Sequence, residues 1–187
     1  VLTLEAGTLR LRRLIDNLLE SVRIESGELA LRRVEVHLDE VVEEAVALAG
    51  PLLARQGHLL EVDLPHPMPP IAADPTRLAQ VLVNLLANAI NYTQRGNVSL
   101  EVERDEVSPE RIRFVVIDTG IGMSAEQLDK VFELFYRGES SNQSGKGIGM
   151  SLVKRFCDRF GWSITLDSEP GKGTVATVSL PETSYID

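Results

Sequence analysis

Three short segments, in a fixed order along the chain, carry side chains and backbone groups that could do chemistry together. The first offers amide oxygens that can ligate a metal, the second an acceptor carboxylate, and the third bare backbone amides, each next to an expected helix end. Together they supply the groups that a pocket for a magnesium-bound nucleotide requires. The segments are Asn84-x-x-x-Asn88, Asp118-x-Gly120-x-Gly122 and Gly145-x-Gly147-x-Gly149.

The asparagines lie on a helix that the sequence predicts from Pro75 to about Tyr92, with Asp74 as its N-cap. Because they are four residues apart, Asn84 and Asn88 share one face of that helix, and Asn91 follows about one turn later. Most isolated pairs of helical asparagines are solvated or capping residues. Asparagine is also a poor helix former, so three of them within eight residues favour a functional role.

Asp118 ends an apolar run that predicts a buried strand, and Gly120 and Gly122 follow it. A plain β-turn accounts for an Asp-x-Gly sequence equally well. In the functional interpretation, the carboxylate accepts a hydrogen bond from an exocyclic amine, and the glycines let a flat ring approach the backbone.

The third segment precedes a helix expected from about Gly147 to Phe160, so its free amides could hold phosphates. It is not a Walker loop, because no glycine lies five residues before Gly145 and Gly147 stands where Ser or Thr must follow the lysine. It is not a dinucleotide fingerprint either, since a polar loop rather than a strand precedes it. Residues 137–146 have the polar, small-residue composition of a mobile loop.

Five segments in this order closely resemble the N, G1, F, G2 and G3 boxes of bacterial sensor histidine kinases. Those enzymes share an ATP-binding fold with type II topoisomerases, MutL-type repair proteins and heat-shock chaperones. Residues 11–31 (LRRLIDNLLESVRIESGELAL) also resemble the second helix of the dimerisation and phosphoacceptor domain, so the resemblance covers nearly the whole chain. The five boxes are residues 74–93 (DPTRLAQVLVNLLANAINYT), 118–123 (DTGIGM), 132–137 (FELFYR), 145–150 (GKGIGM) and 171–174 (GKGT).

On the phosphate side, the resemblance implies that Asn88 ligates Mg²⁺, that Asn84 supports the phosphates and that Arg137 reaches the terminal phosphate. These three would be the catalytic residues. The hinge and phosphate cradle of a lid over the nucleotide would be formed by Gly145, Lys146, Gly147, Ile148, Gly149 and Met150.

On the base side, the resemblance implies that Asp118 binds the adenine amino group and that Thr174 hydrogen-bonds near Asp118 and the base. The other residues that it implies for nucleotide binding are Gly120, Gly122 and Met123 beside the ring, with Asn91 and Tyr92 lining the site.

Two positions depart from the family's pattern. Asn91 stands where many relatives carry a phosphate-binding lysine, and Lys146 stands where many carry Thr or Ser. That Lys146 supplies the positive charge missing at Asn91 is a conjecture that the sequence leaves open.

Hydrolysing relatives carry a glutamate at the position of Asn84, and an amide cannot act as a general base. The phosphoryl group is therefore expected to pass to a protein acceptor rather than to water.

Ahead of these motifs, Leu4 to about Ser26 predicts a helix that Gly27 is expected to stop. Its single narrow apolar stripe needs a partner, and we expect it to be a dimer-forming surface that is incomplete in this chain. The resemblance divides the chain into residues 1–28, the C-terminal helix of the dimerisation and phosphoacceptor domain, and residues 29–187, the catalytic ATP-binding domain. The stripe consists of Leu4, Leu11, Ile15, Leu18 and Val22.

The expected fold is α/β: a two-layer sandwich (the Bergerat ATP-binding fold) with a mixed sheet covered by three helices and preceded by a long helix. Further helices are expected from Asp39, as N-cap, to Gly57, and from Ser124, in a capping box with Gln127, to about Phe132. Gly161 is expected to end the helix that follows the glycine-rich segment. Strands are expected at residues 29–38, 58–64, 97–104, 111–118, 163–168 and 174–180, the last two forming a hairpin through residues 169–173.

The 187 residues allow one domain with a core and a helical appendage. A formal net charge of −9, from 19 basic and 28 acidic residues, weighs against a nucleic-acid partner.

Cys157 stands in an apolar setting that predicts a buried, inert thiol in a reducing compartment. No apolar run is long enough to span a membrane and no signal peptide opens the chain. Because Val1 is not expected to be a native start, a membrane segment ahead of it stays open. The aromatic residues expected in the core are Phe132, Phe135, Phe160 and Trp162.

The resemblance implies an ATP-dependent protein-histidine kinase that transfers the γ-phosphoryl group of Mg-ATP to a histidine, for relay to a response-regulator aspartate. None of His37, His58 and His66 resembles a phosphoacceptor, so that histidine is expected outside this chain. The implied partners are ATP or ADP, the acceptor helix, a cognate response regulator and a second copy in the full-length protein, with this part on the cytoplasmic side of an inner membrane.

Two other functional classes stay open at this point. One is a noncatalytic or serine-kinase-type regulatory module that binds nucleotide, and the leading helix argues against it. The other is a hydrolytic ATPase, and Asn84 argues against that.

Overall fold

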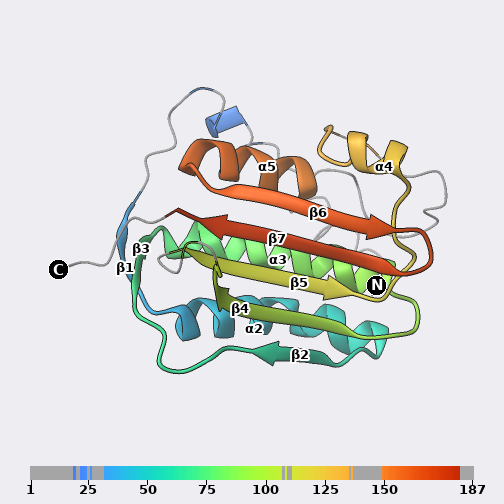
Figure 1. The fold of residues 1–187 in the computed structure, drawn as a ribbon, viewed down its shortest axis with the longest axis horizontal. Coiled ribbons are helices and arrows are strands. Elements are labelled where there is room, and N and C mark those ends of the chain that lie inside the picture. The colour runs from blue at the N-terminus through green and yellow to red at the C-terminus, as the bar shows by residue number, and fades with distance from the viewer. Residues whose placement is uncertain are drawn as a thin grey trace, which may run out of the picture.

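A mixed five-stranded sheet forms one layer of the structure, and helices pack against one of its faces (Figure 1). The computed structural model describes residues 19, 22–24, 26, 32–106, 108, 111–134, 136 and 149–181. β2 runs parallel to β4, and all other neighbouring strands run antiparallel, which confirms the predicted mixed sheet. The strands lie in the order β2 (Leu60–Asp63), β4 (Val98–Arg104), β5 (Ile112–Asp118), β7 (Gly173–Leu180) and β6 (Ser163–Glu169).

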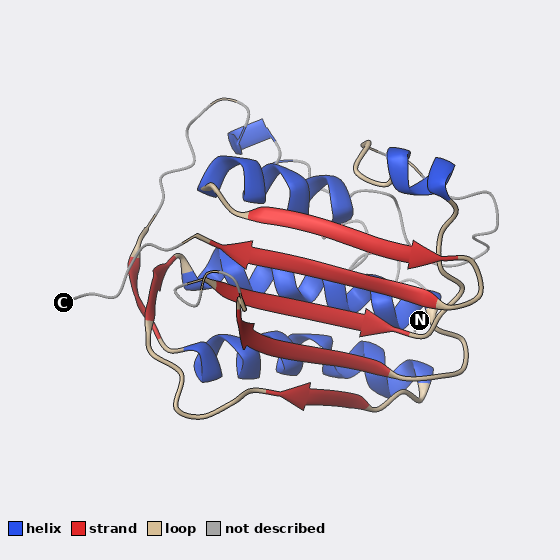
Figure 2. Ribbon diagram, viewed as in Figure 1, coloured by secondary structure: helices blue, strands red, loops and turns tan. Residues whose placement is uncertain are grey.

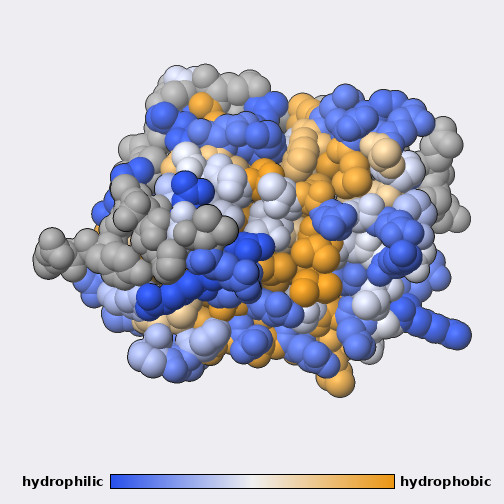
Figure 3. Space-filling model, in the orientation of Figure 1, coloured by the Kyte–Doolittle hydropathy of each residue, from blue (hydrophilic) through white to orange (hydrophobic). Residues whose placement is uncertain are grey.

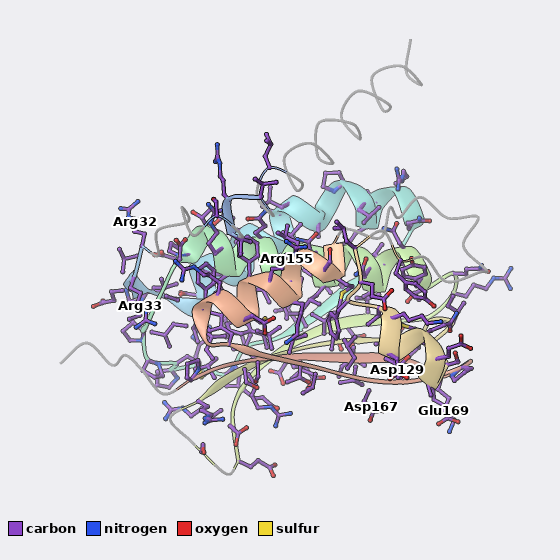
Figure 4. The ribbon with its side chains drawn as sticks, turned by 90° about the horizontal axis from the view of Figure 1, so that it is seen from above. Arg32, Arg33, Asp129, Arg155, Asp167 and Glu169 are labelled. Carbon is purple, nitrogen blue, oxygen red and sulfur yellow. The ribbon has the colours of Figure 1, made fainter. Side chains whose placement is uncertain are left out.

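Three helices form the second layer, on one side of the sheet, as the views in Figure 2 and Figure 4 both show. They are α2 (Leu38–Gln56), α3 (Pro75–Tyr92) and α5 (Gly149–Phe160). The short α4 (Ala125–Lys130) lies near the end of β6, and β1 (Val34–Val36) pairs with β3 (Ile71–Ala73) in a separate two-stranded sheet. The two-layer α/β sandwich with three covering helices is therefore confirmed. None of the described helices is both long enough and apolar enough to cross a membrane.

The hydrophobic core fills the space between the two layers. Leu82 of α3, Phe114 of β5 and Phe156 of α5 are all completely buried there. Phe160 is buried as predicted, and Trp162 packs on it with ring centroids 5.0 Å apart. Burial of these side chains is the main stabilising contribution to a domain of this kind, and it fixes α3 and α5 against the sheet.

Cys157 lies within the same core and has no disulfide partner. Burial raises the pKa of its thiol to about 12, so the sulfur stays protonated at neutral pH. A protonated and inaccessible thiol is a poor nucleophile, which agrees with the predicted inert cysteine.

Local sequence signals explain where most of the elements begin and end. The side chain of Asp74 accepts a hydrogen bond from Arg77 N at 3.2 Å, and Pro75 occupies the first turn, so α3 has the predicted bounds. Ser124 and Gln127 form the expected capping box at α4. Gly57, with a φ of 71°, adopts the left-handed conformation that ends α2.

Two expectations for the first part of the chain were wrong, and one strand was missed. Asp39 is not the N-cap of α2; the helix begins at Leu38, and Asp39 lies in its first turn, where its charge favours the helix N-terminus. Of the strand predicted over residues 29–38, the structure describes residues 32–38, and within these the strand is Val34–Val36 while Leu38 already belongs to α2. The short β3 was not predicted, because three apolar residues after a Pro-rich loop carry no strand periodicity.

The other face of the sheet carries no described helix, and Figure 3 looks directly onto it. Strand alternation places Val115, Ile117 and Val175 on this face. The space-filling view in Figure 3 shows an apolar band across the middle of the face, with hydrophilic residues on both sides. Side chains of the sheet that face the helices therefore come from the positions that alternate with these, such as Asp118 on β5.

Candidate functional site

One edge of α3 is polar, while Leu78, Leu82 and Ile90 of the same helix are buried in the core. Asn84, Asn88, Asn91 and Tyr92 are all half-buried along this edge. At a rise of about 1.5 Å per residue, Asn84 and Tyr92 are about 12 Å apart along the helix axis. The edge is therefore long enough to lie beside an extended ligand with chemically different ends.

The beginning of α5 lies against the first of these asparagines. Asn84 Nδ2 donates a hydrogen bond to Gln80 O at 2.9 Å, which leaves Oδ1 for the opposite side. A Cβ atom added at Gly149 would lie 3.1 Å from that Oδ1, so the first turn of α5 and Asn84 are close neighbours. Helix N-terminal amides favour anions, and they lie here beside an amide side chain. Met150, the next residue, packs partly against the core.

Asp118 ends β5 on the helix side of the sheet and is only 8 % exposed. Its Oδ1 accepts a hydrogen bond from Gly120 N at 2.8 Å, and the backbone of Thr174 bonds to the same carboxyl group. Burial raises the pKa of Asp118, and these two hydrogen bonds lower it in part. The carboxylate is thus a desolvated acceptor with capacity for a further donor.

The turn after Asp118 is held from both sides by backbone hydrogen bonds. Ile121 N donates to Tyr92 O at 3.2 Å, and Gly171 N donates to Ile121 O at 2.8 Å. A side chain at Gly120 would collide with the carbonyl of Tyr92, and one at Gly122, whose φ is 64°, would collide with the carbonyl of Glu169. Glycines are therefore required here by close backbone contact, apart from any ligand.

Ser168, at the end of β6, was missed by the sequence analysis. Its Oγ accepts from Met123 N at 2.8 Å, donates to Gly173 O at 2.9 Å and lies 2.8 Å from Thr174 Oγ1. It ties the turn that contains Gly122 to the β6–β7 hairpin. A signal for it existed, because the predicted strands end at Ser168 and begin again at Thr174, and the structure pairs these two residues across the hairpin.

The described residues offer neutral oxygen ligands rather than a preformed metal cluster. Within the described part of the chain, no group of three or more His, Cys, Asp or Glu side chains could hold a metal ion. The side-chain amide of Asn88 makes no hydrogen bond to any other described residue. Magnesium is commonly held by one or two protein oxygens together with phosphate oxygens and waters, and this donor set fits that arrangement.

Several predicted site residues fall outside what the structure describes. These are Arg137, Gly145, Lys146, Gly147 and Ile148, together with the rest of the loop over residues 137–148. Most of the other predicted residues form two groups joined by α3: Asn84 with Gly149, and Tyr92 with Asp118, Gly120, Gly122, Met123 and Thr174. Asn88 and Asn91 lie on α3 between Asn84 and Tyr92, and Met150 follows Gly149 on α5.

Comparison with known families identifies the arrangement. Residues 73–184 match the family described as histidine kinase-, DNA gyrase B-, and HSP90-like ATPases. The chain belongs to this ATPase family. The matched range runs from the end of β3 through β7, and so includes every described residue of the site.

Two relatives are much longer proteins, and one of them is named as a sensor. The chain is 36 % identical to the non-motile and phage-resistance protein of Caulobacter vibrioides, over 90 % of this chain and 20 % of that protein. It is 31 % identical to the sensor protein GacS of Pseudomonas syringae pv. syringae, over 95 % of this chain and 20 % of that protein. The chain thus spans about a fifth of the length of these relatives.

Solved structures agree with the sequence relatives of this ATPase family. Full-length ShkA in complex with AMPPNP superposes with a TM-score of 0.81 at 27 % identity, covering 91 % of this chain and 35 % of that one. Acinetobacter baumannii histidine kinase AdeS superposes with a TM-score of 0.80, covering 97 % and 83 %, and at 22 % identity it supports the fold alone. The predicted resemblance to sensor histidine kinases is confirmed, whereas the individual residue roles stay predictions.

Proposed function

We propose that this chain is the catalytic part of a two-component sensor histidine kinase. It binds Mg-ATP and transfers the γ-phosphoryl group to a histidine outside the chain, from which the group passes to an aspartate of a response regulator. The observation that supports this most directly is that α3 joins two groups: the buried acceptor Asp118 lies near its C-terminal end, and the start of α5 lies beside Asn84, in the middle of the helix.

At the base end, the carboxylate of Asp118 would accept a hydrogen bond from the adenine amino group. Its Oδ1 already accepts from Gly120, which fixes the orientation of the carboxyl group before a ligand arrives. Preorganisation of this kind reduces the ordering that binding requires. Tyr92 and the glycine turn would then lie beside the ring.

At the phosphate end, Asn84 and Asn88 face the same side of α3, and Asn84 lies next to the first turn of α5. Asn88 would hold Mg²⁺ through its amide oxygen, and the metal when bound would neutralise phosphate charge during transfer. Asn84 would position the phosphates. Because an amide cannot abstract a proton, neither asparagine would activate water, and transfer to a protein acceptor is favoured over hydrolysis.

The roles of the residues outside the described part belong to the same proposal. Arg137 would contact the terminal phosphate, and residues 145–148 would complete the phosphate cradle with Gly149. Residues 1–28 would belong to the dimerisation and phosphoacceptor domain, and residues 29–187 to the catalytic domain. In the whole protein this part would lie on the cytoplasmic side of an inner membrane, beside the acceptor helix of a homodimer.

Titration with a fluorescent ATP analogue in the presence of Mg²⁺ tests nucleotide binding. Loss of a charge-assisted hydrogen bond in Asp118→Asn should weaken binding by about 1.5–3 kcal/mol, or roughly 10- to 150-fold. Asp167→Asn removes an exposed carboxylate from the opposite face of the sheet and serves as the matched control (Figure 4). Equal, weak binding by wild type and Asp118→Asn would contradict the proposal.

A further inference from the structure

We propose that Ser168 is a positioning residue for base recognition. It fixes the hydroxyl group of Thr174 as a hydrogen-bond acceptor toward the pocket, and so makes the site favour adenine over guanine. The inference rests on the proposed function, because that function places a purine base beside Asp118 and Thr174.

The three side chains form a row across the end of the sheet. Asp118 of β5 pairs with Thr174 of β7, which pairs with Ser168 of β6, so all three side chains lie on the same face. Asp167 and Glu169 project away from the helices in Figure 4, and Ser168 between them projects toward the helix layer. The row therefore faces the same side as the polar edge of α3.

Proton counting fixes the direction of each hydrogen bond around Ser168. Met123 N can only donate and Gly173 O can only accept, so the single hydroxyl proton of Ser168 goes to Gly173 O at 2.9 Å. The contact of 2.8 Å between Ser168 Oγ and Thr174 Oγ1 then requires Thr174 to be the donor. Ser168 Oγ ends with one donated and two accepted hydrogen bonds, which is its full capacity.

This bond consumes the only hydroxyl proton of Thr174. Toward the proposed base site, Thr174 Oγ1 can therefore only accept, and the neighbouring Asp118 carboxylate also only accepts when it is ionised. Two adjacent acceptors match the exocyclic amine of adenine, directly or through a water. They disfavour guanine, which carries a carbonyl at the same position. That carbonyl is an acceptor facing acceptors, so it would be left unpaired in a desolvated site.

Removal of the Ser168 hydroxyl would release the Thr174 proton. In Ser168→Ala, the Thr174 hydroxyl can rotate and donate to a base carbonyl, so discrimination falls. We expect the ratio of the GTP to the ATP dissociation constant to fall roughly 3- to 10-fold, the effect of one hydrogen bond. Ser168→Thr keeps the hydroxyl and should keep most of the ratio.

Competition of unlabelled ATP and GTP against a fluorescent ATP analogue measures this ratio. Thr165→Ala, at an exposed position of the same strand, is the matched control and should leave the ratio unchanged. A purely structural role for Ser168 would weaken both nucleotides equally. Because Ser168 is proposed to act through Thr174, Ser168→Ala should change the ratio little when Thr174→Val is already present.

Two outcomes would overturn the inference while leaving the proposed function intact. One is an unchanged ratio in Ser168→Ala, in a protein that binds ATP and loses that binding in Asp118→Asn. The other is an equal effect of Ser168→Ala with and without Thr174→Val. Failure of the wild-type protein to bind ATP at all would instead count against the proposed function.

Discussion

At the scale of single residues, Asp118 combines two opposing effects on one carboxyl group. Burial raises its pKa, while hydrogen bonds from the backbone of Gly120 and Thr174 lower it, and burial is the larger effect. Such a group is held in a less favourable ionised state than an exposed aspartate. A ligand donor that satisfies the carboxylate relieves part of that penalty, so the unliganded site is prepared for an amine.

This raised pKa predicts a pH dependence of nucleotide binding. Only the ionised carboxylate is purely an acceptor, so affinity should fall by up to about tenfold per pH unit once the pH drops below the pKa of Asp118, which lies above the ordinary 3.8. The free energy of unfolding of the unliganded protein depends on pH in the opposite direction. Because ionisation in the buried site is unfavourable, the contribution of Asp118 to stability declines as the pH rises through its raised pKa.

The ratio of wild-type to Asp118→Asn affinity, measured from pH 4 to pH 8, isolates this effect because titration of the nucleotide itself cancels. Circular dichroism at each pH establishes that both proteins remain folded. A ratio that stays constant as the pH falls would show that Asp118 does not need to be ionised for binding.

At the scale of elements, the site depends on close packing of a turn against a hairpin. Gly122 lies with its α-carbon against the carbonyl of Glu169, and its φ of 64° is left-handed. Gly122→Ala adds both a collision and backbone strain. Gly171 has a similar φ of 77° but has no atom near an added Cβ, so Gly171→Ala adds strain alone.

We therefore expect Gly122→Ala to lower the free energy of unfolding by more than Gly171→Ala, whose effect should be about 1 kcal/mol. The larger loss should be accompanied by loss of ATP binding, because the turn and Asp118 move together. Urea unfolding of both variants, with nucleotide titration of the folded proteins, makes the comparison. Equal losses of unfolding free energy in the two variants would show that the contact between the turn and the hairpin adds nothing to stability.

The elements that were predicted well are those with strong local chemistry at their ends. Asp74 and Pro75 fixed the start of α3, and the capping box fixed α4. Asp39 was misplaced because an acidic residue is favoured both as an N-cap and in the first turn. The short β3 depends on its pairing with β1, which is a tertiary contact that no local pattern shows.

The candidate site divides in the same way. Residue type and spacing made Asp118 and the asparagines of α3 candidates, and the order of the five boxes gave each a predicted role. Ser168 was missed because a serine beside a turn has many ordinary explanations. Its significance comes from the pairing of three strands, which only the assembled sheet shows.

At the scale of the whole molecule, the described histidines are poorly placed to accept a phosphoryl group. His37 and His66 are exposed and outside any helix. His58 Nε2 makes a hydrogen bond of 2.6 Å with Thr93 O, at the end of α3. We therefore expect no autophosphorylation of this chain alone. Incubation with labelled ATP should leave it unlabelled, whereas an added acceptor-helix polypeptide from the same kinase should gain acid-labile label. Acid-labile phosphate on the chain itself would disprove this expectation.

The apolar stripe near the start of the chain makes a second prediction at this scale. Leu4, Leu11, Ile15 and Leu18 lie outside the described residues, but Val22, the last member of the stripe, is 54 % exposed. Ile24, two residues later, packs against the core instead. Val22 is thus exposed to solvent while Ile24 packs against the domain. This is expected where a helix leaves the domain to pack against another copy.

We expect the protein to self-associate through this stripe, because a single narrow apolar face on an isolated helix is only marginally stable in water. Sedimentation at several concentrations should show association that Leu11→Glu/Leu18→Glu abolishes. Leu59→Glu, at a leucine that is 87 % exposed on the α/β domain, is the control and should leave association unchanged. Association that persists in the double variant would refute the dimer surface. Nucleotide affinity should be the same in all three proteins, because the core that holds α3 and α5 against the sheet does not include the stripe.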